Sequence, residues 1–262
     1  MPAQPERSGF DTGPTDRLVF LHGFTQTHHH WHAVAHGIAG RVAARSDRVP
    51  TLTFVDLPGH GLSAHDRNPI AGAGAPLATV TGPGTYVGYS MGGRFALVAA
   101  LARPDLVRRL VVIGATPGID DEDEWAERRA LDDRRAGGLE HGSQGQDGVD
   151  TFLDEWLAAP MFADLPADPH DRTHRRRNTA AGLASSLRTA GTGSQPSLWG
   201  RLHEITVPVL VLAGERDVKF TSIGRGMTDR LPNATFAMLA GAGHAAHTEQ
   251  PDQTARIIAD WL

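Results

Sequence analysis

Residues 86–94 constrain the fold of this chain more than any other stretch, because Gly88 to Gly92 match the pattern G-x-S-x-G. Apolar, β-forming residues precede the pattern, and a helix-forming run at 95–102 follows it. A strand, a sharp turn and a helix in this order hold the central serine on a strained backbone, where only small neighbours avoid a clash. The alternative is a Gly-rich structural turn. The flanking pattern favours a nucleophile elbow with Ser90 at the C-terminal end of a strand.

Composition limits the class of protein. A length of 262 residues fits one large α/β domain with room for an inserted subdomain. The net charge of -5 argues against nonspecific nucleic-acid binding, and the absence of cysteine excludes disulfides and thiol chemistry. The start of the chain lacks the pattern of a signal peptide, and no apolar run reaches the roughly 20 residues of a membrane span. We therefore expect a cytoplasmic protein with no membrane insertion.

Short apolar runs predict an α/β fold, with a mostly parallel twisted sheet flanked by helices. Besides the elbow strand, the predicted strands are 17–21, 51–56, 107–114, 207–213 and 234–239, and a closing helix is predicted over 251–262. The expected core is 1–118 with 200–262, and within it we expect 1–16 to form a loose tail. Residues 64–84 are rich in Ala, Gly and Pro. A parallel sheet needs a crossover there, so we expect a short or irregular helix around 77–80.

Residues 119–199 differ in character from the rest of the chain. They lose the strand pattern and become charged and helical, for example over 120–129 and 149–156. A helical segment inserted between two strands of a sheet is typical of a lid over an active site. The sequence therefore predicts an inserted helical lid over 119–199.

Two further residues complete a catalytic pattern with Ser90. Asp217 and His244 follow predicted strands, as Ser90 does, so all three are expected on one edge of the sheet. Their chain order, Ser then Asp then His, is the order that nucleophile-elbow folds use. Glu215 is the alternative acid, but Asp217 lies further into the loop. A surface position is the alternative for His244, and the Gly-rich turn before it favours the catalytic interpretation.

The His22-Gly23-Phe24 turn at the end of the first strand predicts an oxyanion hole. In a nucleophile-elbow fold this loop lies beside the elbow, so the backbone N–H of Phe24 can join that of Met91. His22 is expected to brace the loop through hydrogen bonds.

A histidine-rich block at 28–32 follows this turn. One interpretation is a metal site. Adjacent histidines point in different directions, however, and no carboxylate or cysteine spacing accompanies them. We expect a His-rich loop and first helical turn, with Trp31 packed inward, and no metal or cofactor.

Together these motifs resemble the α/β-hydrolase superfamily over nearly the whole chain. Within it, the chain most resembles the 2-succinyl-6-hydroxy-2,4-cyclohexadiene-1-carboxylate synthase family of menaquinone biosynthesis. The stretches that carry this narrower resemblance are 21–26, 88–94, 125–128, 156 with 160–162, 175–178, 191–199, 214–220 and 243–247. The family's helix over 64–84 is usually well formed, and here this segment departs from the pattern.

The resemblance implies a lyase that eliminates pyruvate from 2-succinyl-5-enolpyruvyl-6-hydroxy-3-cyclohexene-1-carboxylate, with the triad acting as a base. It implies a small polyanionic substrate whose carboxylates are held by arginines. These are Arg94, Arg128 and Arg175, although Arg176 or Arg177 could replace the third. The implied pocket residues are Tyr89, Trp156 and Phe162. Arginine binds carboxylate bidentately, and a simple esterase has no need of Arg94 one helical turn from its nucleophile.

Two other function classes remain open at this point. One is a serine hydrolase that uses the same triad on an ester or a carbon–carbon bond. The other is a non-enzymatic ligand-binding module, against which the complete triad argues. Convergence of Arg94, Arg128 and Arg175 on Ser90 would favour the lyase. We expect a monomer or a weak homo-oligomer.

Overall fold

The computed structural model describes residues 17–46, 49–142, 145–166 and 168–262, so the predicted tail at 1–16 lies outside the described part. Within it, six strands form one parallel sheet in the order β2-β1-β3-β4-β5-β6. The strands are β1 (Arg17–Leu21), β2 (Thr51–Val55), β3 (Gly84–Tyr89), β4 (Val107–Ile113), β5 (Val209–Gly214) and β6 (Ala234–Leu239). The α/β prediction is confirmed, and the predicted bounds of β1 and β6 agree with the structure.

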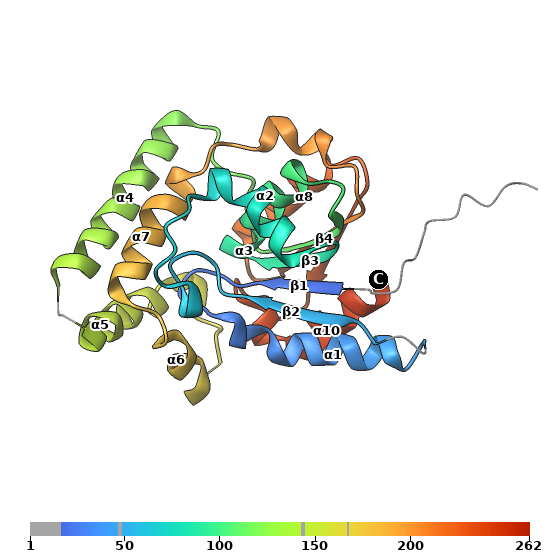
Figure 1. Cartoon of the computed structure of the whole chain (residues 1–262), viewed down its shortest axis with the longest axis horizontal. Helices are drawn as coiled ribbons and strands as arrows, with labels where there is room; N and C mark the ends of the chain where they lie inside the picture. The colour runs from blue at the N-terminus through green and yellow to red at the C-terminus, as the bar shows by residue number, and fades with distance from the viewer. Residues whose placement is uncertain (1–16, 47–48, 143–144, 167) are drawn as a thin grey trace, which may run out of the picture.

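Helices cover both faces of this sheet (Figure 1). Helices α1 (His32–Ala43) and α10 (Pro251–Trp261) lie on one face, and α2 (Ile70–Thr81), α3 (Met91–Ala102) and α8 (Val218–Thr228) lie on the other. Alternation along β1 explains the two cores, because Leu18 and Phe20 face α1 while Val19 and Leu21 face α3. Strand β3 therefore lies in the middle of a sheet that helices cover on both sides. This packing fixes the position of Ser90, the residue that follows β3.

Helix α2 is longer and more regular than the sequence predicted. The expectation was a short or irregular helix around 77–80; a helix does cover these residues, but its expected extent is wrong, because α2 runs over twelve residues with Pro76 inside it. Gly74 permits close packing on α3, because a Cβ at this position would lie 2.5 Å from the backbone oxygen of Val98. Burial of Ile70, Ala73 and Ala78 against the core thus compensates for weak helix propensity.

The chain between β4 and β5 is mainly helical. It contains α4 (Glu122–His141), α5 (Gly145–Leu157), α6 (Pro169–Arg175) and α7 (Ala180–Ala190), and Figure 1 shows these helices gathered beyond one end of the strands. Helices α4, α5 and α7 share a small apolar core of their own. Short 3₁₀ turns lie at His28–Trp31, Gly61–Ser63, Pro160–Phe162, Thr192–Ser194 and Trp199–Glu204, and a one-turn helix, α9, spans Ala246–Glu249. In the described residues, no helix has the length and apolar character that crossing a bilayer requires.

Candidate active site

Ser90 occupies a strained turn between β3 and α3. Its backbone has φ 49° and ψ -110°, an unfavourable conformation for a residue with a side chain. The flanking glycines are required by contact: a Cβ on Gly88 would lie 2.4 Å from the Gly92 carbonyl oxygen, and one on Gly92 would lie 2.0 Å from that of Leu21. The surrounding backbone thus fixes the position of the Ser90 hydroxyl.

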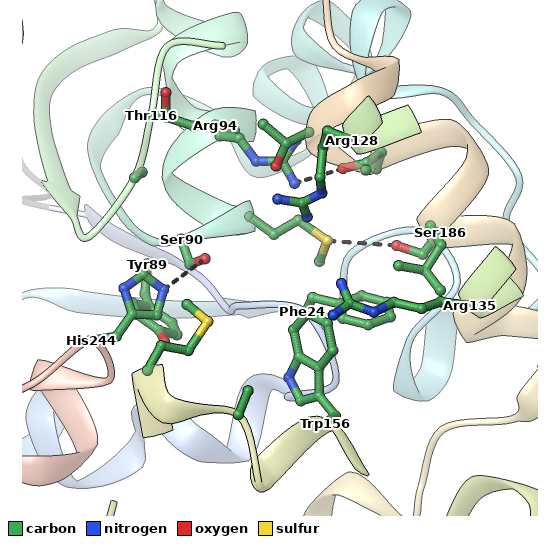
Figure 2. A pocket seen from close by; sticks show the side chains of 18 of the residues that line it. Phe24, Tyr89, Ser90, Arg94, Thr116, Arg128, Arg135, Trp156, Ser186 and His244 are labelled. Atoms are coloured by element: carbon green, nitrogen blue, oxygen red, sulfur yellow. Dashed lines mark hydrogen bonds between the residues drawn. The ribbon is translucent and has the colours of Figure 1, made fainter. Parts of the chain in front are cut away.

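Three side chains form a hydrogen-bonded chain at this edge of the sheet. His244 donates from Nδ1 to Asp217 Oδ2 at 2.7 Å, and its Nε2 lies 3.4 Å from Ser90 Oγ (Figure 2). The second distance is at the long end for a hydrogen bond, as is common before substrate binds. Glu215 is engaged elsewhere, because its carboxylate accepts from the Gly241 amide at 2.8 Å. The geometry therefore pairs Asp217, and not Glu215, with His244.

Local structure orients Asp217 and His244. Asp217 is the N-cap of α8 and its Oδ1 accepts from the Phe220 amide at 3.2 Å. The imidazole of His244 is buried, with its centroid 4.4 Å from the ring of Phe220 and 5.3 Å from that of Tyr89. One carboxylate oxygen holds the helix while the other holds the imidazole, so the acceptor has little freedom to turn away.

The loop after β1 brings Phe24 to the elbow. His22 braces it as expected, accepting from the Leu57 amide at 3.0 Å while its Nδ1 donates to the Gly23 carbonyl at 2.8 Å. Met91 is the first residue of α3, so its amide is one of the unpaired donors at a helix start. Among the described residues, neither the Phe24 nor the Met91 amide donates to another protein group. Both remain available for an anionic oxygen.

Thr25 ties this loop to the inserted helices, a role that the sequence did not reveal. Its φ of 67° is unusual for a β-branched residue. Its amide donates to His60 Nε2 at 3.2 Å, and its carbonyl accepts from Asn178 Nδ2 at 2.7 Å. The Arg175 guanidinium donates to its hydroxyl. A positive φ at a threonine cannot be recognised in the sequence, so only the structure identifies the role of Thr25.

A cavity of about 280 Å³ lies over Ser90. Nine of the predicted residues line it, namely Ser90, His244, Phe24, Met91, Tyr89, Arg94, Arg128, Trp156 and Phe162. Figure 2 shows the guanidinium groups of Arg94 and Arg128 near each other in one wall, with the Trp156 ring on another side. The cavity thus combines a nucleophile, aromatic walls and cationic groups.

Arg94 is buried in this wall. Its guanidinium donates to the Ala190 carbonyl at 2.6 Å and to Gln195 Oε1 at 3.2 Å, both neutral acceptors. Burial and then the neighbouring charge of Arg128 lower the pKa of Arg94 to about 9. Since a guanidinium has five N–H donors, the two protein bonds leave others for a ligand.

Helix α4 supplies two more cations. Arg128 is partly exposed and its Nε donates to Asp132 Oδ1 at 3.0 Å. Arg135, seven residues further along, also lines the cavity, with its guanidinium 5.1 Å from the centre of the Trp156 ring. Burial, followed by the charge of Arg128, lowers the pKa of Arg135. Sequence reasoning missed Arg135, although the spacing of seven places it on the same helix face as Arg128.

Arg175 does not join the other arginines, which corrects the expectation of three arginines around Ser90. It is 1% exposed and is absent from the cavity lining. At the end of α6, its Nε donates to Asp171 Oδ2 at 2.7 Å, one helical turn back, and the rest of its guanidinium reaches Thr25. Its alternatives, Arg176 and Arg177, are exposed and also lie outside the lining.

Comparison with known sequences places the chain in a family. The sequence profile described as "Alpha/beta hydrolase family" matches residues 18–257, nearly the whole length. The chain therefore belongs to the α/β-hydrolase family, in agreement with its sheet and its elbow.

Its relatives define a narrower group. A Salmonella typhimurium protein named 2-succinyl-6-hydroxy-2,4-cyclohexadiene-1-carboxylate synthase is 32% identical over 98% of this chain and 96% of its own length. A Bacillus subtilis protein, provisionally given the same name, is 39% identical over 67% of this chain but only 64% of its own length. The chain thus falls within the group of these synthases.

Solved structures agree with this placement. The structure of MenH from S. aureus superposes with a TM-score of 0.81 at 31% identity, covering 96% of this chain and 95% of that one. An enol-lactonase from Burkholderia xenovorans LB400 superposes with a TM-score of 0.72 over 97% of this chain and 93% of its own, at 20% identity, a likeness of fold alone.

Proposed function

We propose that this protein eliminates pyruvate from 2-succinyl-5-enolpyruvyl-6-hydroxy-3-cyclohexene-1-carboxylate, giving 2-succinyl-6-hydroxy-2,4-cyclohexadiene-1-carboxylate. The observation that carries the proposal is that Arg94, Arg128 and Arg135 line the same small cavity as Ser90 and His244. The substrate has three carboxylates, on the ring, the succinyl group and the enolpyruvyl group. Three cationic side chains in one cavity match that charge, whereas a neutral ester offers them no carboxylate.

The reaction follows from comparing substrate and product. The ring double bond at C3 of the substrate is replaced by double bonds at C2 and C4 of the product. A proton therefore leaves C2, the C2=C3 and C4=C5 bonds form, and the C5–O bond breaks with its electrons on the departing enolpyruvate. Protonation of that enolate at its methylene carbon gives pyruvate. No water is consumed, so the reaction is an elimination and not a hydrolysis.

In this scheme Ser90, His244 and Asp217 act as the base. His244 takes the hydroxyl proton of Ser90, and Ser90 Oγ removes the proton from C2. The 2.7 Å hydrogen bond from His244 Nδ1 to Asp217 stabilises the imidazolium that forms. The strained elbow supports this role because it fixes Oγ at the floor of the cavity.

The Phe24 and Met91 amides have a corresponding role. Removing the C2 proton next to the succinyl ketone builds negative charge on the ketone oxygen. These two N–H donors have no protein acceptor, so they can bind the ketone oxygen as its charge grows. They therefore stabilise the transition state more than the bound substrate, and the barrier falls.

The experiment is a direct turnover assay with the enolpyruvyl substrate. Pyruvate is measured by a coupled dehydrogenase, and the conjugated diene by its absorbance. We expect equal amounts of both products, and Ser90→Ala should slow the reaction about 100- to 10,000-fold with its circular dichroism unchanged.

A neutral p-nitrophenyl ester separates this proposal from a serine hydrolase on the same triad. The proposal requires that the wild-type kcat/KM for the polyanionic substrate greatly exceed that for the ester. Faster ester hydrolysis, or near-normal elimination by the Ser90→Ala variant, would assign the site to a hydrolase or to a different base.

A further inference from the structure

A cluster of histidines lies apart from the cavity. Each of His28, His29 and His32 offers one ring nitrogen, and these three atoms lie within 4.8 Å of one another. None of the three residues lines the cavity over Ser90. The sequence argued against a metal here because adjacent histidines usually diverge, and the structure removes that objection.

The backbone explains why the three rings converge. His28 and His29 belong to a 3₁₀ turn, and His32 begins α1 immediately after it. The three rings form a triangle: the centroid of the His29 ring lies 4.0 Å from that of His28 and 5.1 Å from that of His32, and the last two are 5.9 Å apart. His30, which the same turn directs inward, is buried and pairs with Asp171 instead.

We propose that His28, His29 and His32 bind a divalent first-row transition-metal ion such as Zn²⁺. Imidazole nitrogen is a preferred ligand of these ions, at about 2.0–2.1 Å for zinc. Tetrahedral geometry at that distance separates two nitrogens by about 3.3 Å. The rings are partly exposed and can close the remaining gap by small rotations. The fourth position is open to water.

Asp56 prepares His28 for this role. Its Oδ2 accepts from His28 Nδ1 at 2.9 Å and its Oδ1 accepts from the His28 amide at 2.8 Å. The Leu62 amide, at 2.9 Å, holds the same carboxylate from another side. A carboxylate on one imidazole nitrogen fixes the ring and makes the other nitrogen, Nε2, a better ligand. This arrangement occurs around metal-bound histidines.

The other two imidazoles are free to coordinate. Among the described residues, no group hydrogen-bonds to a ring nitrogen of His29 or His32. His174 stacks on His29 at 4.4 Å and shields one side of the ring.

The test is a calorimetric titration of ZnCl₂ into the full chain, purified without a histidine tag and freed of metal with a chelator. We expect one ion per chain and a higher thermal midpoint in the presence of Zn²⁺. His29→Ala and His32→Ala should each weaken binding at least about tenfold and abolish the thermal shift. Both positions are partly exposed, and circular dichroism of the metal-free variants checks their folding.

Two matched variants make the assignment specific. His65→Ala removes an exposed histidine outside the cluster and should bind Zn²⁺ as the wild type does. His36→Ala removes the next histidine along α1, which is not among the three converging residues. Unchanged affinity in His29→Ala, or an equal loss in His36→Ala or His65→Ala, would overturn the site. Loss of binding in His29→Ala and His32→Ala alone would establish it.

Discussion

The guanidinium of Arg94 lies near that of Arg128 in the wall of the cavity, and this like charge adds to burial in lowering the pKa of Arg94 to about 9. Asp132, the acid that opposes this effect, is already bonded to Arg128. The free protein thus holds two cations close together around one carboxylate. Repulsion of this kind is relieved when an anion binds between the cations, which favours a carboxylate-bearing ligand over a neutral one.

Arg128 gives the first prediction. Arg128→Gln removes a cavity cation but keeps a side chain that can donate to its buried partner Asp132, and circular dichroism checks that the variant folds. A charge-assisted bond to a carboxylate is worth about 1.5–3 kcal/mol, so kcat/KM for the polyanionic substrate should fall about 10- to 100-fold. Hydrolysis of a neutral ester probe should hardly change.

The matched control is Arg129→Gln, the next residue on α4. Its guanidinium lies over Trp125, 5.4 Å from the ring centre, and does not line the cavity. Equal losses in the two variants, or an equal loss on both substrates, would show that Arg128 does not bind a substrate carboxylate.

Arg135 gives the second prediction. Since its guanidinium lies against Trp156 in the cavity wall, Arg135→Gln should raise KM for the polyanionic substrate about tenfold, with a smaller effect on kcat. Steady-state kinetics over a range of substrate concentrations separates the two constants. A fall in kcat with KM unchanged would instead place Arg135 in contact with the developing charge.

The sequence predicted the parts of this site that depend on local rules. The elbow, the position of His244 after the last strand and the order of the three residues all follow from strand ends in a parallel sheet. The bracing role of His22 followed from its place beside a Gly turn. Each of these predictions needs only the position of a residue relative to the end of a strand.

What the sequence could not predict depends on contacts between distant segments. Arg175 has a carboxylate one helical turn away in Asp171, and only the fold shows that this pair, with Thr25, holds it outside the cavity. Helix α2 packs closely on α3 where Gly74 meets Val98, and its composition cannot indicate this contact. In both cases a tertiary contact outweighs the local pattern.

Asp217 gives the third prediction. Asp217→Asn keeps the size of the side chain but removes the charge that stabilises protonated His244, so kcat should fall about 100- to 10,000-fold. Glu215→Gln is the matched control, because Glu215 lies two residues away and its carboxylate accepts from the Gly241 amide. A larger loss in Glu215→Gln than in Asp217→Asn would reverse the assignment of the acid.

Asn178 gives the fourth prediction. It joins the inserted helices to two loops, donating to the Thr25 carbonyl at 2.7 Å and accepting from the Gly61 amide at 2.9 Å. Asn178→Ala removes the partner of the buried Thr25 carbonyl and of the partly buried Gly61 amide, so the free energy of unfolding should fall by about 1–3 kcal/mol. Because Thr25 follows Phe24, kcat should fall as well. Urea denaturation and turnover measure the two effects, and exposed Arg177→Ala should show neither.

His60 gives the last prediction, which concerns the stability of the fold at acidic pH. Its Nδ1 donates to the Pro58 carbonyl and its Nε2 accepts from the Thr25 amide, so a second ring proton would point at an N–H donor. Complete burial lowers the pKa of His60 to about 4. In the unfolded chain the imidazole of His60 has the ordinary pKa of about 6.5. As the pH falls from about 6.5 to about 4, His60 therefore takes up a proton in the unfolded state but not in the folded state. The free energy of unfolding should decrease across that window, by on the order of 3 kcal/mol from His60 alone.

Urea denaturation at several pH values between 7 and 4 tests this directly. Burial also lowers the pKa of His22 and His247 well below the usual value, so both add to the slope of the wild type. His60→Gln removes one titrating group and should flatten the slope by up to about 1.4 kcal/mol per pH unit, whatever its stability at pH 7. His65→Ala removes an exposed histidine instead, and as the control it should keep the wild-type slope. A His60→Gln slope equal to that of the wild type would mean that His60 carries its second proton in the folded state, and that the loop holding Phe24 does not depend on a neutral imidazole.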